Sequence, residues 1–448
     1  MRDLTKGSIT GHVISMAAFI GISQLFQTLY FIVDLYFVSR LGSAAIAGVS
    51  AAGNVFFIAL AASQMISIGV LALVAQAVGR KADAEANLYS DQALSMSVLF
   101  GAAMLVLGYA FGGLWVTVLT PDAATAAQAR AFLYGFLPSL ALLFPTMALI
   151  SALRGAGVVR PTMVVQTATV LLNVALAPVL IVGWGTGVAM GAFGAGLASS
   201  IASAIGLVAL VLMFPRVQRA LRLHWNALKP RFDAWKRIAF IGFPTSLEFL
   251  MMFIVFAVIY YVIRDFGAEA QAGFGIGGRI MQSIFLPAMA VAFAAAPIAG
   301  QNFGAGEHDR VRETFKVTAL IGSAIMATLS VLCHIAPQLM ALPFTQDPDV
   351  IAVTTDYLRI TSWNFVAAGL VMTASSLFQG MGDTRPSLFA SMTRLGTFAA
   401  PALWLSTQPW AELVHVWWVS VFSTALQCLL SVWLLLATFK RKLKPKGA

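Results

Sequence analysis

The chain alternates between long apolar runs and short polar stretches over its whole length. A helix needs about 20 mostly apolar residues to cross the hydrocarbon core of a bilayer. Twelve segments reach this length, at approximately residues 12–38, 46–77, 88–118, 130–153, 162–183, 188–214, 238–263, 270–299, 314–340, 354–379, 386–405 and 413–438. A transmembrane barrel would instead show alternating strands of about 10 residues. The pattern therefore predicts an all-α integral membrane protein with twelve transmembrane helices.

The composition excludes a soluble globular domain. Of the 448 residues, 59% are hydrophobic and 10% are charged, whereas a soluble domain carries about 25% charged residues. Cys333 and Cys428 both lie in apolar runs, so we expect buried hydrophobic side chains and no disulfide or metal site. The first apolar segment has no small-residue cleavage site after it, and we expect it to be retained as a span.

The basic residues predict the orientation in the membrane. The chain has 28 Lys and Arg residues and a formal net charge of +10. Twenty-two of the 28 fall on one set of loops, and four fall on the opposite set. Because Lys and Arg concentrate in cytoplasmic loops, we predict a multi-pass plasma-membrane protein, of a bacterial inner membrane, with both termini cytoplasmic. The charge is thus a topology signal and attracts anionic lipid headgroups; a nucleic-acid partner is not expected.

The second half of the sequence matches the first at a constant offset of 225. The stretch "SALRGAGVVRPT" at 151–162 lies over "SLFQGMGDTRPS" at 376–387, and "RLGSAAIAG" at 40–48 lies over "DFGAEAQAG" at 265–273. Likewise, "LTPDA" at 119–123 lies over "FTQDP" at 344–348. The shift spans six helices, an even number, so both halves enter the membrane in the same sense. Parallel repeats of this kind occur in secondary transporters.

The repeat predicts two pseudo-symmetric six-helix lobes. We assign the N-terminal lobe to residues 1–214 and the C-terminal lobe to residues 238–438. A basic cytoplasmic linker, 215–237, joins the lobes and is expected to include a short amphipathic helix. A basic cytoplasmic tail, 439–448, follows the second lobe.

Three motifs now carry a family resemblance. They are the early "VDLYFVSRLG" at 33–42, the doubled GxGxxRP at 155–161 and 380–386, and "LPAMAVAFAAAPIAGQNFGAG" at 286–306. Together they resemble the multidrug and toxic compound extrusion (MATE) family over nearly the whole chain. The resemblance implies a transporter that exports amphipathic, often cationic compounds in exchange for an inward flow of H⁺ or Na⁺. It implies no cofactor besides this coupling ion, and we expect a monomer in the lipid bilayer.

Asp34 is the first of two acids well inside the predicted spans. An ionisable residue in a span is by default a functional hypothesis, because burying its charge costs several kcal/mol. Gln27 lies seven residues back, on the same helix face, and Asn54 is a further candidate to line the cavity. A structural carboxylate, satisfied by Gln27 and Asn173, is the alternative reading.

The resemblance assigns a role to Asp34 and its companions. An aspartate at this position in the family binds the coupling cation or proton, together with residues that match Asn173 and Ser199 here. The family's second acid is replaced by Ala177. A Na⁺ at Asp34 and Asn173 would therefore have few hard oxygen ligands. A lone buried carboxylate suits a proton carrier, so H⁺ is favoured slightly over Na⁺.

Glu248 is the second acid, about ten residues into the seventh span. It matches a glutamate that part of the family carries at this spacing from a proline. Two roles stay open: Glu248 attracts cationic substrate, or it pairs with Arg279 or Arg394 and holds the lobe together. We place Met252 and Arg279 with Glu248 in the substrate cavity, since methionine repacks around varied ligands.

Two other functions fit the sequence less well than a multidrug antiporter that works by alternating access. A flippase for lipid-linked sugars, from the same superfamily, would need several basic residues in its cavity, and only Arg279 and Arg394 lie in or beside spans. A membrane-embedded enzyme would need a paired His/Asp or His/Glu or a GxSxG nucleophile within the spans. Neither that pairing nor an ATP-binding Walker loop is present in the sequence.

Overall fold

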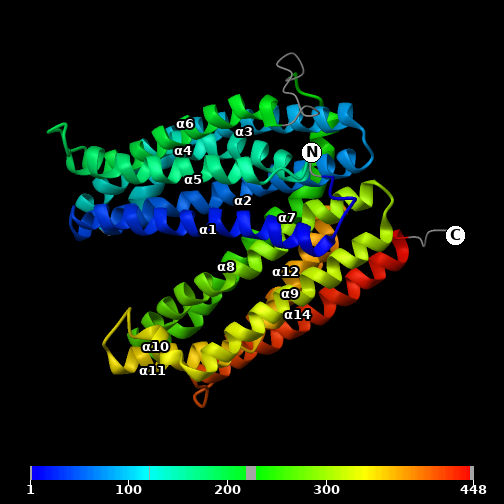
Figure 1. The fold of residues 1–448 in the computed structure, drawn as a ribbon. Coiled ribbons are helices and arrows are strands. Elements are labelled where there is room, and N and C mark those ends of the chain that lie inside the picture. Colours follow the sequence, from blue (N-terminus) through cyan, green and yellow to red (C-terminus); the bar gives the residue numbers. More distant parts are fainter. Residues whose placement is uncertain (1–2, 121, 218–228, 444–448) are drawn as a thin grey trace. The chain divides into compact units, whose positions relative to one another are not determined.

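The computed structural model describes residues 3–120, 122–217 and 229–443, and every regular element in these ranges is helical (Figure 1). The elements are α1 (Ile9–Ser39), α2 (Ser43–Gly79), α3 (Asp83–Leu119), α4 (Ala123–Gly155), α5 (Arg160–Ala177), the π-helix η1 (Pro178–Val182), α6 (Gly191–Val217), α7 (Phe232–Ile263), the 3₁₀-helix η3 (Arg264–Phe266), α8 (Ala268–Gly304), α9 (His308–Ile335), α10 (Pro337–Ala341), α11 (Pro348–Thr361), α12 (Asn364–Gly380), α13 (Arg385–Leu405) and α14 (Leu413–Lys442). The all-α prediction is confirmed. The amphipathic helix expected in the linker falls mainly on residues 218–228, outside the described ranges.

The helices agree with the predicted spans, with two differences. Within the described residues, ten helices are long and apolar enough to cross a membrane, and α11 and α12, which are bent by 56° at their junction, bring the number to eleven if they are counted together as one span. The predicted span 386–405 coincides with α13, which is 21 residues long. The span predicted over 354–379 is interrupted, because α11 ends at Thr361 and α12 begins at Asn364. The predicted helix 314–340 also stops early, at Ile335, and α10 begins separately at Pro337.

The break between α11 and α12 is supported by side-chain hydrogen bonds. Ser330 Oγ donates to the carbonyl of Ser362 at 2.9 Å, and His334 Nδ1 lies 3.1 Å from Ser362 Oγ. In the first half of the chain, the repeat aligns Trp363 with Pro138, which lies inside α4. Proline removes a backbone hydrogen bond from a helix. The position of the break in the second half therefore corresponds to a proline inside a continuous helix in the first half.

The backbone repeats at the offset predicted from the sequence. Gly42 precedes α2 with φ 101° and ψ 172°, and Gly267 precedes α8 with φ 102° and ψ 171°. Asp122 caps α4 by accepting the backbone N–H of Thr125 at 2.8 Å. Asp347, its counterpart in the repeat, caps α11 by accepting the N–H of Asp349 at 3.0 Å. The repeat seen in the sequence is thus a repeat of helix starts and turns.

Close helix packing repeats as well. Gly155, at the end of α4, packs against the backbone of α2 so closely that an added Cβ would lie 2.7 Å from the carbonyl oxygen of Leu71. Gly380, at the end of α12, makes the equivalent approach to the carbonyl of Ala296 in α8. Small residues at such crossings let two helix backbones meet, which is how helices associate inside membranes.

By packing, the chain divides into two compact units. Unit 1 is built mainly from Ile22–Ser246, and unit 2 from Leu4–Gly21 and the residues from Leu247 onward. The boundary in α1 lies after Gly21 and the boundary in α7 lies after Ser246, and these two positions are related by the repeat offset. Unit 2 therefore contains the first part of α1, and unit 1 contains the first part of α7. The predicted lobe boundaries at residues 214 and 238 follow the sequence repeat and stay a prediction.

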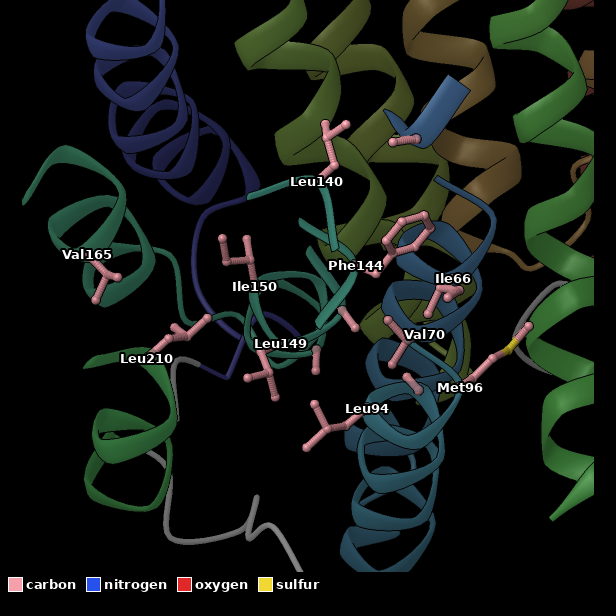
Figure 2. Packing of buried hydrophobic residues seen from close by; sticks show 14 of the residues in the cluster. Ile66, Val70, Leu94, Met96, Leu140, Phe144, Leu149, Ile150, Val165 and Leu210 are labelled. Carbon is pink, nitrogen blue, oxygen red and sulfur yellow. The ribbon is translucent and has the colours of Figure 1, made fainter. Parts of the chain in front are cut away.

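The core of unit 1 is a continuous apolar cluster between its helices. Figure 2 shows the side chains that α2, α3, α4, α5 and α6 contribute, among them Ile66, Val70, Leu94, Met96, Leu140, Phe144, Leu149, Ile150, Val165 and Leu210. The first part of α7 adds buried residues to the same cluster, including Ile238. The segment that leads into α7 is tied down by Gln92, which donates to the carbonyl of Lys229 at 2.9 Å and accepts the N–H of Arg231 at 2.7 Å.

Unit 2 anchors the start of the chain in the same way. Leu4 is fully buried. Its N–H donates to Gln301 Oε1 at 3.2 Å, and its carbonyl accepts from Asn302 Nδ2 at 3.1 Å and from Arg310 at 3.2 Å. The repeat aligns Leu4 with Lys229. The segments that lead into α1 and α7 are therefore held through equivalent carbonyl groups.

Candidate functional site

Unit 1 brings together two of the predicted coupling residues. Asn173 in α5 and Ser199 in α6 are both buried, and Asn173 Nδ2 donates to Ser199 Oγ at 3.2 Å. Ala177 is fully buried four residues after Asn173. The amide oxygen and the hydroxyl can serve as polar ligands, whereas the methyl group of Ala177 contributes none. The pair alone is also consistent with an ordinary interhelical hydrogen bond.

The other unit 1 candidates lie on α1 and α2. Asp34 belongs to α1, but its side chain lies outside the described part of the structure. Gln27, also on α1, is half-buried. Asn54 on α2 is exposed and donates to the carbonyl of Ala51 at 3.3 Å.

Unit 2 holds Glu248 in a hydroxyl-rich environment. Glu248 Oε2 accepts from Ser375 Oγ of α12 at 3.3 Å. That hydroxyl in turn accepts from Ser387 Oγ of α13 at 2.9 Å and from Gln379 Nε2 at 3.3 Å. The second carboxylate oxygen, Oε1, is buried and has no hydrogen-bond partner among the described residues. One side of the carboxyl group is thus held in place, and the other can accept a proton or face a cation.

The residues proposed as partners of Glu248 lie elsewhere in unit 2. Within the described residues, no ion pair joins Glu248 to Arg279 or Arg394. Arg279 is exposed on α8, and Met252 is exposed on α7, one helical turn after Glu248. Arg394 is half-buried on α13, and its Nε has no hydrogen-bond partner in this part of the chain. The geometry gives Glu248 serine neighbours in place of arginine neighbours.

Sequence reasoning missed the residues around Glu248. Ser375, Gln379 and Ser387 lie in or beside the second copy of the GxGxxRP motif. Their counterparts in the first copy include Arg154 in place of Gln379. A comparison of the two copies would have singled out this polar difference. The hydrogen bond from Ser375 to Glu248 joins α12 to α7, which is far away along the chain. No pattern in the local sequence indicates such a contact.

The comparisons with known proteins agree with this architecture. A family model described as MatE matches residues 20–179 and, a second time, residues 244–405. The starts and the ends of the two matched ranges are related by nearly the same offset as the sequence repeat. Together the ranges cover well over half of the chain.

Similar proteins align along most of their length. The probable multidrug resistance protein YoeA of Bacillus subtilis is 23% identical over 405 residues, which are 88% of this chain and 87% of that protein. The probable multidrug resistance protein NorM of Thermotoga maritima is 25% identical over 392 residues, 84% of this chain and 81% of that protein.

Solved structures show the same fold. A MOP superfamily transporter from Pyrococcus furiosus superimposes with a TM-score of 0.91 at 19% identity, over 99% of each chain. An outward-facing multidrug resistance transporter of the MATE family gives a TM-score of 0.91 at 20% identity, again over 99% of each chain. The chain therefore belongs to the multidrug and toxic compound extrusion (MATE) family and is a multi-pass membrane transporter, not an enzyme.

Proposed function

We propose that this transporter exports amphipathic, cationic compounds in exchange for cations that flow inward, with H⁺ as the coupling ion. The observation that carries the proposal is the carboxyl group of Glu248, which has one oxygen on Ser375 and the other buried without a partner among the described residues. A carboxylate inside a span is costly unless it binds a cation, exchanges a proton or is fully hydrogen-bonded. Glu248 is thus suited to hold a cationic substrate or a proton in turn.

The relatives support the direction and the breadth of transport. YoeA and NorM are named as probable multidrug resistance proteins, and MepA of Staphylococcus haemolyticus, which is 22% identical over 404 residues, is named as a multidrug export protein. We extend export of varied compounds to this chain. We further propose that it works by alternating access as a monomer, in a bacterial inner membrane with both termini cytoplasmic.

The preference for protons rests on the surroundings of the Asn173–Ser199 pair. We place Asp34 beside this pair as the coupling acid. A Na⁺ prefers several hard oxygen ligands, and Ala177 offers no side-chain oxygen. One carboxylate with an amide and a hydroxyl is a thin ligand set for Na⁺, whereas a single carboxylate is enough to carry a proton.

The test is transport by purified protein in vesicles with imposed H⁺ and Na⁺ gradients, applied separately. We expect a lipophilic cation to exchange when the proton gradient alone is present, and we expect Asp34→Asn to abolish this exchange. Asp349→Asn, an exposed acid in the first turn of α11, is the matched control and should transport normally. Full exchange by Asp34→Asn would overturn the coupling role, and transport driven by Na⁺ alone would overturn the choice of ion.

Glu248→Gln separates substrate binding from coupling. If Glu248 holds the cationic substrate, this variant should bind a lipophilic cation at least tenfold more weakly than the wild type, while an uncharged analogue binds unchanged. Equal weakening for both compounds would show that Glu248 only stabilises unit 2. The flippase alternative would be favoured if cells that lack the transporter accumulated lipid-linked sugars and the wild-type protein exported no drug.

A further inference from the structure

Helix α5 has two opposite faces of different character. One face is exposed and apolar, as expected for contact with lipid, and consists of Val164, Ala168, Leu171 and Ala175. The opposite face carries the polar residues Thr162, Gln166, Thr169 and Asn173, which we call the polar stripe. Intervals of three and four residues keep each set on one side of a helix. The polar stripe rises about 16 Å, from the first turn of α5 to the Asn173–Ser199 hydrogen bond.

Some polar side-chain atoms on α4 and α5 are buried and have no hydrogen-bond partner within the described residues. They are Thr146 Oγ1 and Arg154 Nε on α4, and Gln166 Oε1 and Thr167 Oγ1 on α5. An unpaired buried polar atom is costly. Proteins usually meet this cost with ordered water, which bonds to about three such groups. These atoms are therefore candidates to bind water.

The repeat indicates which faces of α4 and α5 adjoin. In unit 2, Ser387 of α13 and Ser375 of α12 form a hydrogen bond at 2.9 Å. Their counterparts in unit 1 are Thr162 of α5 and Ile150 of α4. The face of α4 that contains Ile150 therefore corresponds to the face that meets the polar stripe.

The unpaired atoms of α4 lie on this same face. Arg154 and Thr146 are placed at i+4 and i−4 from Ile150, one turn to either side. The short connection 156–159 makes α4 and α5 antiparallel neighbours, so Thr146 comes level with Gln166, and Arg154 comes level with the first turn of α5. The unpaired atoms thus accompany the polar stripe from its start to its middle.

The second half does not continue such a stripe to the same depth. Its counterparts on α13 are Ser387, Ser391, Arg394 and Phe398. Phe398 takes the place of Asn173 and is 1% exposed, so an apolar ring ends the polar positions there. Ser391, at the place of Gln166, accepts from a glutamine of α14 at 3.3 Å and has a protein partner. The complete polar stripe belongs to the half in which we place the coupling acid Asp34.

The spacing within the polar stripe suits single water molecules. Three or four residues of helix rise about 4.5–6 Å, and one water with a hydrogen bond on each side spans about 5.6 Å. The hydroxyls of Thr162 and Thr169 donate to backbone carbonyls one turn earlier, which leaves their oxygens free to accept from water. Gln166 and Thr169 are half-buried. Gly206 of α6 lies opposite Thr169, where an added Cβ would collide with the hydroxyl, so the missing side chain gives room there.

We propose that the polar stripe holds a chain of water molecules through which the coupling proton leaves Asp34 for the cytoplasm, with Gln166 as a positioning residue at its middle. This inference rests on the proposed proton exchange and adds its cytoplasmic route. The carboxyl group of Asp34 gives its proton to the first water, each water passes one proton on as it receives one, and the last releases one to the cytoplasm. The carboxylate that remains can take the next proton from outside. The amide of Gln166 both donates and accepts, so it can hold two neighbouring waters.

The first test measures water access without transport. Cys333 and Cys428, both buried, are replaced by alanine, and Thr169→Cys is compared with Leu171→Cys on the lipid-facing side of α5. A charged thiol reagent, enclosed in vesicles on the side of the first turn of α5, reacts only with a thiol that water reaches. We expect Thr169→Cys to react at least tenfold faster than Leu171→Cys. Equal rates, or reaction of Thr169→Cys only from the opposite side, would overturn the inference.

The second test separates proton movement from substrate binding. Gln166→Leu should slow proton-driven exchange of a lipophilic cation at least tenfold, while its binding affinity for that cation changes less than twofold. Gln166→Asn should keep part of the rate, because it keeps the amide. Thr328→Val is the matched control: this exposed hydroxyl on α9 also bonds to its own helix, at 2.9 Å, and its loss should leave exchange unchanged.

Each remaining outcome decides against one account. Unchanged exchange by Gln166→Leu, or a loss of binding as large as the loss of rate, would show a packing role and overturn the inference. If Gln166→Leu does not fold, the thiol reaction of Thr169→Cys decides. A wild type that exchanges lipophilic cations for protons but leaves Thr169→Cys unreactive overturns the route and keeps the proposed function. A wild type that exchanges no lipophilic cation for protons overturns the proposed function, and the inference falls with it.

Discussion

The close crossing at Gly155 gives a prediction with an internal control. An added Cβ would lie 2.7 Å from the carbonyl oxygen of Leu71 and 3.2 Å from the backbone nitrogen of Ala75. Because both are backbone atoms, α2 and α4 would have to separate, and overpacking of this kind costs about 1–3 kcal/mol. Gly53, inside α2, has no atom within 4 Å of its added Cβ. Replacing a helical glycine by alanine otherwise gains about 1 kcal/mol, and this gain is common to both positions.

The difference between Gly155→Ala and Gly53→Ala therefore isolates the steric cost. We expect Gly53→Ala to melt at or above the wild-type temperature and Gly155→Ala to melt below Gly53→Ala by the equivalent of about 1–3 kcal/mol. Thermal unfolding of the purified protein in detergent, followed by tryptophan fluorescence, measures this. Gly380→Ala repeats the experiment in unit 2, where the added Cβ meets Ala296. Equal melting temperatures for the Gly155 and Gly53 variants would refute the argument that backbone contact requires glycine there.

Local geometry gives three further predictions. Gly267→Ala should lower the melting temperature by the equivalent of about 1–3 kcal/mol, because φ 102° and ψ 171° suit glycine alone; an unchanged melting temperature would contradict this. Lys81 has φ 58°, in the left-handed region, where its counterpart in the repeat is Gly306 with φ 73°. Lys81→Gly should raise the melting temperature, because removing the backbone strain of a left-handed residue is worth about 1 kcal/mol. A lower melting temperature would show that the lysine side chain contributes more than the strain costs. The backbone N–H of Thr125 holds the pKa of Asp122 below its ordinary 3.8, so the charged carboxylate stabilises the fold above pH 3.8 and this contribution is lost as the pH falls through the lowered pKa. The difference in melting temperature between wild type and Asp122→Asn should therefore shrink as the pH falls through this range. A constant difference would exclude a role for the charge.

Much of the fold could be predicted because long apolar runs and loop motifs carry strong local signals. Most of the described helices coincide with predicted spans, and the glycines aligned by the repeat have matching backbone angles. The break after Thr361 was not predictable in this way, since neither proline nor glycine marks it. It depends on Ser330 and His334, which come from α9, and such contacts between distant segments do not show as a pattern in one stretch of sequence.

The site was predictable only in part, for a related reason. Asn173 and Ser199 are joined by a hydrogen bond, and their role in coupling stays a prediction. Glu248 was identifiable because an acid in an apolar run is conspicuous. Its serine neighbours were not, since hydroxyl residues are common in membrane helices and usually bond to their own backbone. The role of Asp34 stays a prediction.

The contrast between repeated and unrepeated residues bears on how this transporter divides its work. Glycine crossings and aspartate caps occur twice because both halves pack six helices in the same way, and the same packing imposes the same backbone demands. Embedded charges occur once: Asp34 corresponds to Ile259, Glu248 to Ser23 and Arg394 to Thr169. A charge within the membrane costs several kcal/mol, so a second copy would destabilise the other half unless it bound something there. Because the counterparts are an isoleucine, a serine and a threonine, the two halves are equal as scaffolds and unequal in their embedded charges, with the proton proposed for Asp34 in the first half and the cationic substrate for Glu248 in the second.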